Sequence, residues 1–145
     1  MLEGESVKTN RHLARFAAAR YLPALLANPA LDGMLRIKGR SLRKELIEAY
    51  VVVEALEQRV LVDRQNGQQL VIIDLCCGKG FLSIVVAYEF PACVVLSVDN
   101  NPGIQPCSLP NTRFVLLDVL EVRATSISGT PPLARSRFNS WMIRC

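Results

Sequence analysis

The sequence predicts one α/β domain in which a parallel sheet follows two amino-terminal helices. The first observation is an apolar run at 70–75 that passes through a glycine turn into an apolar helical segment at 81–90. The second is a pair of further apolar runs, at 93–98 and 113–117, each followed by an aspartate. A strand, a helix and a strand in this order predict a βαβ unit with parallel strands. The length of 145 residues is enough for one domain with a real core.

The first predicted helix covers residues 10–27, where apolar residues recur at helical spacing. Thr9 or Asn10 can cap its start, because a short polar side chain accepts hydrogen bonds from the first free N–H groups. We expect Pro23 to break the last turn, since proline lacks the N–H that a helix interior requires.

A second, longer helix is predicted after a loop at 28–40. Ser41 is the expected cap, and apolar residues from Leu42 to Val60 share one face. The polar segment 63–69 is predicted to end this helix before the first strand begins.

The apolar stretch 80–98 has the length of a membrane span but not its composition. Glu89 and Pro91 lie at its centre, so a short helix followed by a buried strand is the better interpretation. Glu3 and Glu5 stand where a secretory leader would be basic. We expect a soluble intracellular protein without membrane contact, cytoplasmic by default, with a nuclear or mitochondrial location left open.

Composition limits the function classes. The net charge of +4 permits contact with nucleic acid, but the basic residues are scattered and fit a solvated surface. The five cysteines include no C-x-x-C pair, which argues against a zinc site or a disulfide framework. We therefore expect no metal and a reducing compartment.

The glycine turn VIIDLCCGKGFLS at 71–83 restricts the ligand class. A phosphate-binding P-loop requires glycine at position 73 and Ser or Thr after the lysine, whereas the sequence has Ile73 and Gly80. A dinucleotide fingerprint requires a third glycine or alanine where Ser83 stands, which leaves NAD or FAD a weak alternative. Asp74 would repel a pyrophosphate and attract a cationic head group. A nucleoside without phosphate, carrying a cationic amino-acid head group, is favoured.

The segment DLCCGKGFLS, with acids after the second and third strands, resembles class I S-adenosylmethionine-dependent methyltransferases. It is most similar to the group whose motif reads D-x-x-x-G-K-G-x-L-S, some members of which modify tRNA. The resemblance covers roughly residues 36–120. It implies a Rossmann-like fold, S-adenosyl-L-methionine as cofactor, and RNA such as tRNA, or protein, as methyl acceptor.

The resemblance also implies the site residues. The two glycines of the turn let the backbone approach the methionine end of the cofactor, Asp99 accepts hydrogen bonds from the ribose hydroxyls, and the end of the third strand brackets the adenine. The candidate cofactor-binding residues are Asp74, Cys76, Gly78, Lys79, Gly80, Asp99, Asn100, Asp118 and Val119.

Three side chains of the turn are expected to be passive, two of them in this set. Lys79 should point to solvent. Cys76 and Cys77 should be small packing residues rather than nucleophiles, since nothing near them in sequence would lower their pKa. No general base can be named.

The sequence departs from the family after the third strand. We divide it into a helix and loop at 1–40, the cofactor-binding half of the domain at 41–120, and an irregular tail at 121–145. Only the first half of the parallel sheet is predicted, with strand 70–75 left at an open, aggregation-prone edge. The alternative function is therefore a truncated, catalytically inactive fragment that binds cofactor or serves as an interaction module.

Overall fold

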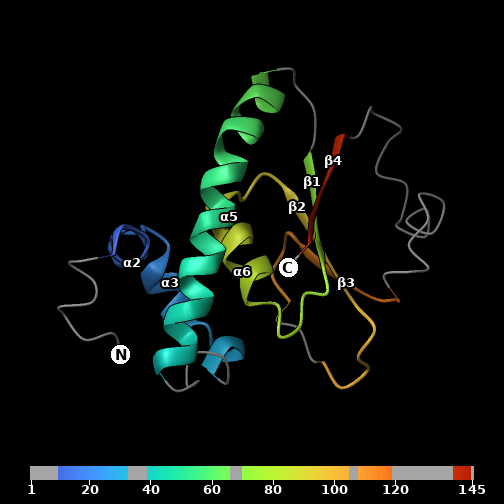
Figure 1. Cartoon of the computed structure of the whole chain (residues 1–145), viewed down its shortest axis with the longest axis horizontal. Helices are drawn as coiled ribbons and strands as arrows, with labels where there is room; N and C mark the ends of the chain where they lie inside the picture. Colours follow the sequence, from blue (N-terminus) through green and yellow to red (C-terminus); the bar gives the residue numbers. More distant parts are fainter. Residues whose placement is uncertain (1–9, 33–38, 66–69, 105–107, 119–138, 145) are drawn as a thin grey trace.

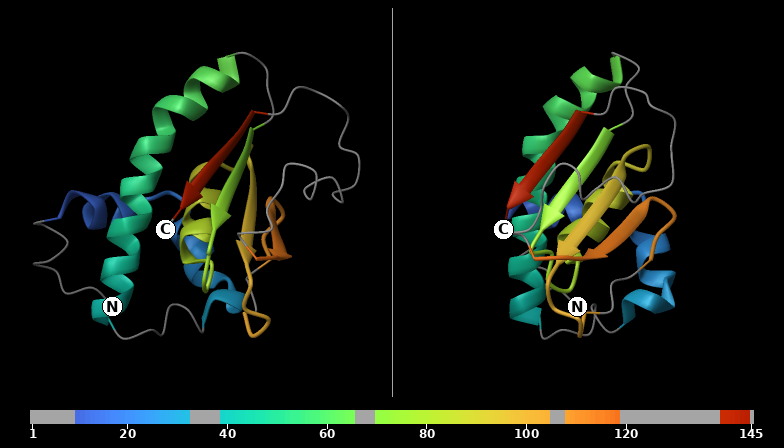
Figure 2. Two further views of the ribbon diagram at one scale, coloured as in Figure 1. Left: turned by 45° about the vertical axis from the view of Figure 1, so that its right-hand side comes forward. Right: turned by 90° about the vertical axis from the view of Figure 1, so that its right-hand side faces the viewer.

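The computed structural model describes residues 10–32, 39–65, 70–104, 108–118 and 139–144. In this part of the chain, helices cover one face of a four-stranded parallel sheet, with strand order β3-β2-β1-β4 (Figures 1 and 2). The strands are β1 (Leu70–Leu75), β2 (Val94–Asp99), β3 (Thr112–Leu116) and β4 (Asn139–Arg144). The helical segments are α2 (Arg11–Ala17), α3 (Leu22–Ala27), the 3₁₀ turn η1 (Pro29–Leu31), α5 (Gly39–Gln65) and α6 (Phe81–Glu89).

The predicted βαβ unit is confirmed. β1 and β2 pair in parallel from Val71 and Val94 onward, and α6 connects them. β3 continues the sheet beyond β2, also in parallel. The apolar stretch 80–98 therefore divides into a helix and a buried strand, as predicted. Among the described residues, no helix is long and apolar enough to cross a bilayer.

The expectation of an irregular tail is wrong at its end, where β4 forms. β4 pairs in parallel with β1 from Leu70 opposite Asn139 to Leu75 opposite Arg144. β1 consequently has a neighbour on each side, and the predicted open edge at β1 is wrong as well. Periodicity alone could not reveal this strand, because its partner lies far away in the sequence.

The amino-terminal helix is divided differently from the prediction. Asn10 is confirmed as the cap of α2, since its side-chain oxygen accepts hydrogen bonds from the N–H groups of His12 and Leu13 at 3.0 and 3.2 Å. The break falls after α2, earlier than predicted. Pro23 lies in the first turn of α3, where its missing N–H has no intrahelical partner to lose.

The long helix α5 extends beyond both predicted ends. It begins at Gly39, so Ser41 lies inside the helix and is not its cap. It runs to Gln65, so the polar residues 63–65 belong to the helix rather than to the loop. A polar run does not stop a helix by itself, because polar residues such as Arg and Gln have favourable helix propensities.

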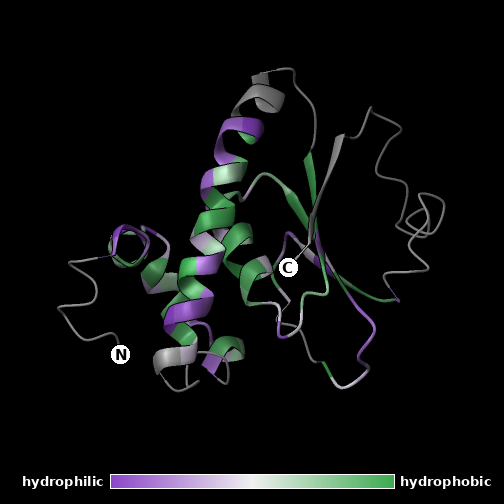
Figure 3. Ribbon diagram, in the orientation of Figure 1, coloured by the Kyte–Doolittle hydropathy of each residue, from purple (hydrophilic) through white to green (hydrophobic). Residues whose placement is uncertain are grey.

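The core lies between the sheet and helices α5 and α6. Alternate strand residues Leu70, Ile72 and Val95 are buried in one cluster with α5 and α6 residues. Figure 3 shows the apolar colouring along α6, β1 and β2. The intervening strand residues form a second cluster: Ile73, Leu75, Leu96 and Val98. The two-residue period of a strand thus assigns Asp74 and Ser97 to the α6 side of the sheet.

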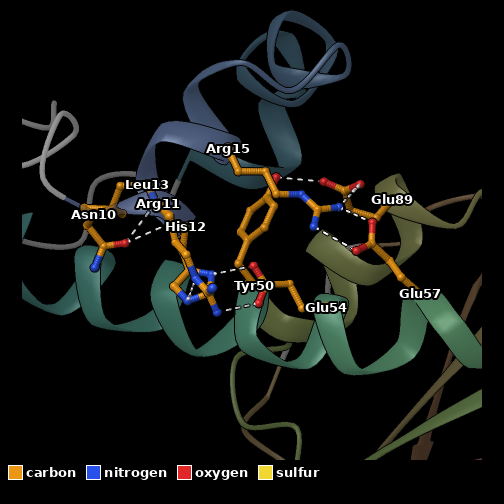
Figure 4. Close-up of polar contacts among 9 residues, drawn as sticks. All are labelled: Asn10, Arg11, His12, Leu13, Arg15, Tyr50, Glu54, Glu57 and Glu89. Carbon is orange, nitrogen blue, oxygen red and sulfur yellow. Dashed lines mark hydrogen bonds and ion pairs between the residues drawn. The ribbon is translucent and has the colours of Figure 1, made fainter.

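A cluster of polar side chains connects α2 with α5 and α6 (Figure 4). The Arg15 guanidinium pairs with Glu57 at 2.5 Å and with Glu89 at 3.7 Å, and lies 5.3 Å from the centre of the Tyr50 ring. The Tyr50 hydroxyl donates to Glu89 at 2.7 Å and lies 2.7 Å from the Tyr21 hydroxyl. Burial raises the pKa of both tyrosines, so both hydroxyls remain protonated at neutral pH.

Tyr50→Phe is expected to lower the free energy of unfolding by about 1–3 kcal/mol, because it removes a buried donor to a carboxylate. Urea unfolding measures the loss. Tyr88→Phe is the matched control: the ring, which stacks on Tyr21 at 5.1 Å, is retained, and a change within about 0.5 kcal/mol is expected. Equal stability of Tyr50→Phe and the wild type would mean that the cluster adds nothing to the fold.

Candidate functional site

The turn between β1 and α6 has an unusual backbone. Cys76, Gly78 and Gly80 have φ angles of +58°, +52° and +74°. The left-handed region is open to glycine, whereas at a residue with a Cβ it costs about 1–2 kcal/mol. Such strain in a non-glycine residue accumulates at functional sites. The position of Cys76 therefore marks this turn as the first place to look for a ligand.

Gly78 is half-buried and Gly80 is buried, but both have free space where a side chain would begin. Among the described residues, a Cβ added at Gly78 or at Gly80 would have no heavy atom within 4 Å apart from those of its chain neighbours. These glycines are thus required by their φ angles and not by close packing of the protein around them. A ligand can therefore approach the backbone at the half-buried Gly78, and the free space continues beside the buried Gly80.

Asp99 ties the end of β2 to the glycine turn. Its Oδ2 accepts a hydrogen bond from the Gly78 N–H at 2.9 Å, and its Oδ1 accepts one from the Asn101 N–H at 3.0 Å. The Cys77 N–H adds a bond to the Val98 carbonyl at 3.1 Å. The structure therefore brings together Gly78 and Asp99, which the sequence analysis placed in one site.

Asp74 is a buried carboxylate beneath the first turn of α6. Its side chain is 1% exposed, and its Oδ2 accepts a hydrogen bond from the Ser83 hydroxyl at 2.5 Å. The Ser97 hydroxyl donates in turn to Ser83 at 2.6 Å. The other carboxylate oxygen, Oδ1, is buried and has no hydrogen-bond partner among the described residues. Burial raises the pKa of Asp74, hydrogen bonds from Ser83 oppose this shift, and the nearby Asp99 adds to it.

The raised pKa of Asp74 predicts a pH-dependent stability. An acid with a higher pKa in the folded state stabilises the fold most at a pH below its unfolded value of about 3.9. This contribution is lost as the pH rises through the folded pKa. We expect the loss in the wild type and its absence in Asp74→Asn, measured by chemical unfolding across that pH range. Identical pH profiles for the two proteins would contradict the assignment.

The other turn side chains follow the predictions in part. Lys79 is exposed, as expected. Cys77 is half-buried, and burial together with Asp74 and Asp99 raises its pKa to about 12, so it is no nucleophile at neutral pH. Cys76 is exposed, so its prediction as a packing residue is wrong.

The remaining candidates lie at the ends of β2 and β3. Asn100 is exposed and directly follows β2. Asp118 is half-buried two residues beyond β3, and the Leu117 N–H bonds the Asp99 carbonyl at 2.9 Å. Val119 lies outside the described residues. The parallel strands thus bring Asp74, Asp99 and Asp118 to one edge of the sheet.

Two residues of the site were missed as functional: Ser83 and Ser97. Ser83 was noted only as a departure from the dinucleotide fingerprint. The presence of serine at position 83, where the fingerprint has glycine or alanine, was the signal that could have revealed its role. No signal pointed to Ser97, whose role depends on the pairing of β1 with β2.

No protein-family model, curated protein or solved structure matches the chain. Among the described residues, no group of three or more His, Cys, Asp or Glu side chains could hold a metal ion.

Proposed function

We propose that the chain is the cofactor-binding part of a class I S-adenosylmethionine-dependent methyltransferase with a Rossmann-like fold. Its methyl acceptor is RNA, such as tRNA, or protein, and its location is intracellular. The observation that carries the proposal is the hydrogen bond between the Gly78 N–H and the Asp99 carboxylate. It joins a glycine turn after β1 to an acid after β2, the two features on which the motif resemblance rests.

The strand order supports this proposal. In open parallel sheets, ligands bind outside the carboxyl ends of the strands, at the point where the strand order reverses. The order β3-β2-β1-β4 has this reversal between β1 and β4. The glycine turn follows β1 directly and therefore lies beside that point.

The residues of the turn fit the cofactor. The free space beside Gly78 and Gly80 leaves room for a nucleoside thioether against the backbone. Asp74 and Asp99 supply carboxylates, which suit hydroxyl and ammonium donors and repel phosphates. When bound, the cofactor supplies a methyl group activated by a sulfonium. The residues of this chain orient it, and orientation is the main protein contribution to such a displacement.

The runner-up function is a catalytically inactive cofactor-binding or interaction module. One observation favours it: no helix connects β2 to β3 in the described residues 100–104 and 108–111. The helix expected on the second face of a doubly wound sheet is therefore not found in those residues.

Binding and turnover distinguish these functions. Calorimetry with S-adenosylmethionine, S-adenosylhomocysteine, NAD and ATP should give binding of the first two alone. Transfer of a labelled methyl group to cellular RNA or protein would support the enzyme, and binding without transfer would support the inactive module. Binding of NAD alone would favour an oxidoreductase, and binding of none would overturn the proposal.

A further inference from the structure

Ser97, Ser83 and Asp74 form a buried chain of hydrogen bonds from β2 through α6 to β1. Their exposed fractions are 4%, 3% and 1%, so water does not replace these bonds. The Ser97 hydroxyl donates to the Ser83 hydroxyl oxygen. The Ser83 hydroxyl hydrogen is therefore free to donate to Asp74 Oδ2. The two hydrogen bonds therefore point the same way, from Ser97 through Ser83 to the Asp74 carboxylate.

These hydrogen bonds use only one of the two oxygens of the Asp74 carboxylate. Asp74 Oδ1 is buried and finds no hydrogen-bond partner in the part of the chain that the structure describes. An unsatisfied buried carboxylate oxygen is costly. The cost is greater because Asp99 raises the pKa of Asp74, which means that the two acids repel each other when both are ionised. A positively charged donor would form a hydrogen bond with Oδ1 and also reduce the repulsion between the two acids. A neutral donor would form the hydrogen bond without reducing the repulsion.

We propose that Ser83 and Ser97 are positioning residues that hold Asp74 with Oδ1 free for an ammonium group. Asp74 then selects nucleosides whose head group carries an ammonium over nucleosides without one. This inference rests on the proposed function and deepens it. Oδ1 is out of contact with solvent, so the groups that cover it must move when the ligand binds.

Two ligands that differ only in the head group test the selection. S-adenosylhomocysteine carries a zwitterionic amino-acid head group with the ammonium and a carboxylate, and 5′-methylthioadenosine retains the nucleoside and thioether without that group. Ser83→Ala should weaken binding of S-adenosylhomocysteine about tenfold and change binding of methylthioadenosine less than about twofold. Ser97→Ala should have the same pattern with a smaller effect, and it serves as the test if Ser83→Ala fails to fold. Ser41→Ala, an exposed serine on α5, is the control.

A ligand-free measurement tests the positioning itself. The Asp74 carboxyl carbon, followed by NMR titration, should have a higher pKa in Ser83→Ala than in the wild type, because a donor to the charged form is lost. In the Asp74→Asn background, Ser83→Ala should weaken S-adenosylhomocysteine binding no further. An unchanged Asp74 pKa would overturn the positioning role.

The outcomes separate this inference from the proposed function. Equal weakening of both ligands by Ser83→Ala would make the serines merely structural and overturn the inference, while nucleoside binding would stand. If the wild type binds neither ligand, the proposed function fails and the inference fails with it.

Discussion

Gly80→Val is expected to abolish S-adenosylhomocysteine binding and to lower the free energy of unfolding by about 2 kcal/mol. Gly80 has a φ of +74°, where a β-branched residue is strongly disfavoured. Because an added Cβ would have no heavy atom of the described residues within 4 Å beyond its chain neighbours, the stability loss comes from backbone strain and not from a clash. The open space is where the proposed ligand meets the backbone, so the side chain should also exclude the ligand.

Gly80→Ala and Gly103→Ala are the companion variants. Gly80→Ala has the strain with a smaller side chain, so it should bind weakly rather than not at all. Gly103 lies in a loop, and its added Cβ would meet only the Asn101 side-chain oxygen at 3.2 Å. We expect nearly wild-type binding for Gly103→Ala. Wild-type affinity in Gly80→Val would show that the turn is only structural.

Asp99→Ala should weaken S-adenosylhomocysteine binding about 10- to 100-fold. Hydrogen bonds to a charged acceptor contribute roughly 1.5–3 kcal/mol, which corresponds to this range. Part of the loss would be indirect, since Asp99 also accepts the N–H groups of Gly78 and Asn101. Calorimetry of the folded variant measures the affinity.

The control for this prediction is Asn101→Ala. It retains the backbone N–H that bonds Asp99 and loses only a side chain that accepts from the Gly103 N–H at 2.9 Å. Binding close to wild type is expected. If Asp99→Ala also binds like the wild type, Asp99 does not belong to the site.

The sequence was sufficient for the elements whose signals are local. The run 70–75 is apolar apart from Asp74, and the glycine turn and the apolar helix follow without interruption, so β1 and α6 were predicted with nearly correct ends. β4 was not predicted, because the short run NSWMIR lies in a tail rich in turn-forming residues. Its pairing with β1 supplies the missing backbone partners, and such long-range pairing leaves no trace in periodicity.

The candidate site was predictable to the same degree. Gly78, Gly80 and Asp99 follow from the motif, and the structure joins the first and last by a hydrogen bond. The strain at Cys76 could not be foreseen, since a cysteine gives no sign of a positive φ. The Ser97–Ser83–Asp74 chain depends on three elements meeting in the core, which requires the fold to be known.

The central place of β1 has a consequence for biosynthesis. Its partner β4 follows it by about 70 residues, and chains are synthesised at about 5–20 residues per second. One edge of β1 therefore lacks its partner β4 for roughly 4–14 s after β1 has been synthesised. During that interval its free N–H and C=O groups can pair with another nascent chain. Slowing translation between β3 and β4 should increase aggregation, and a chaperone that shields strand edges should reduce it.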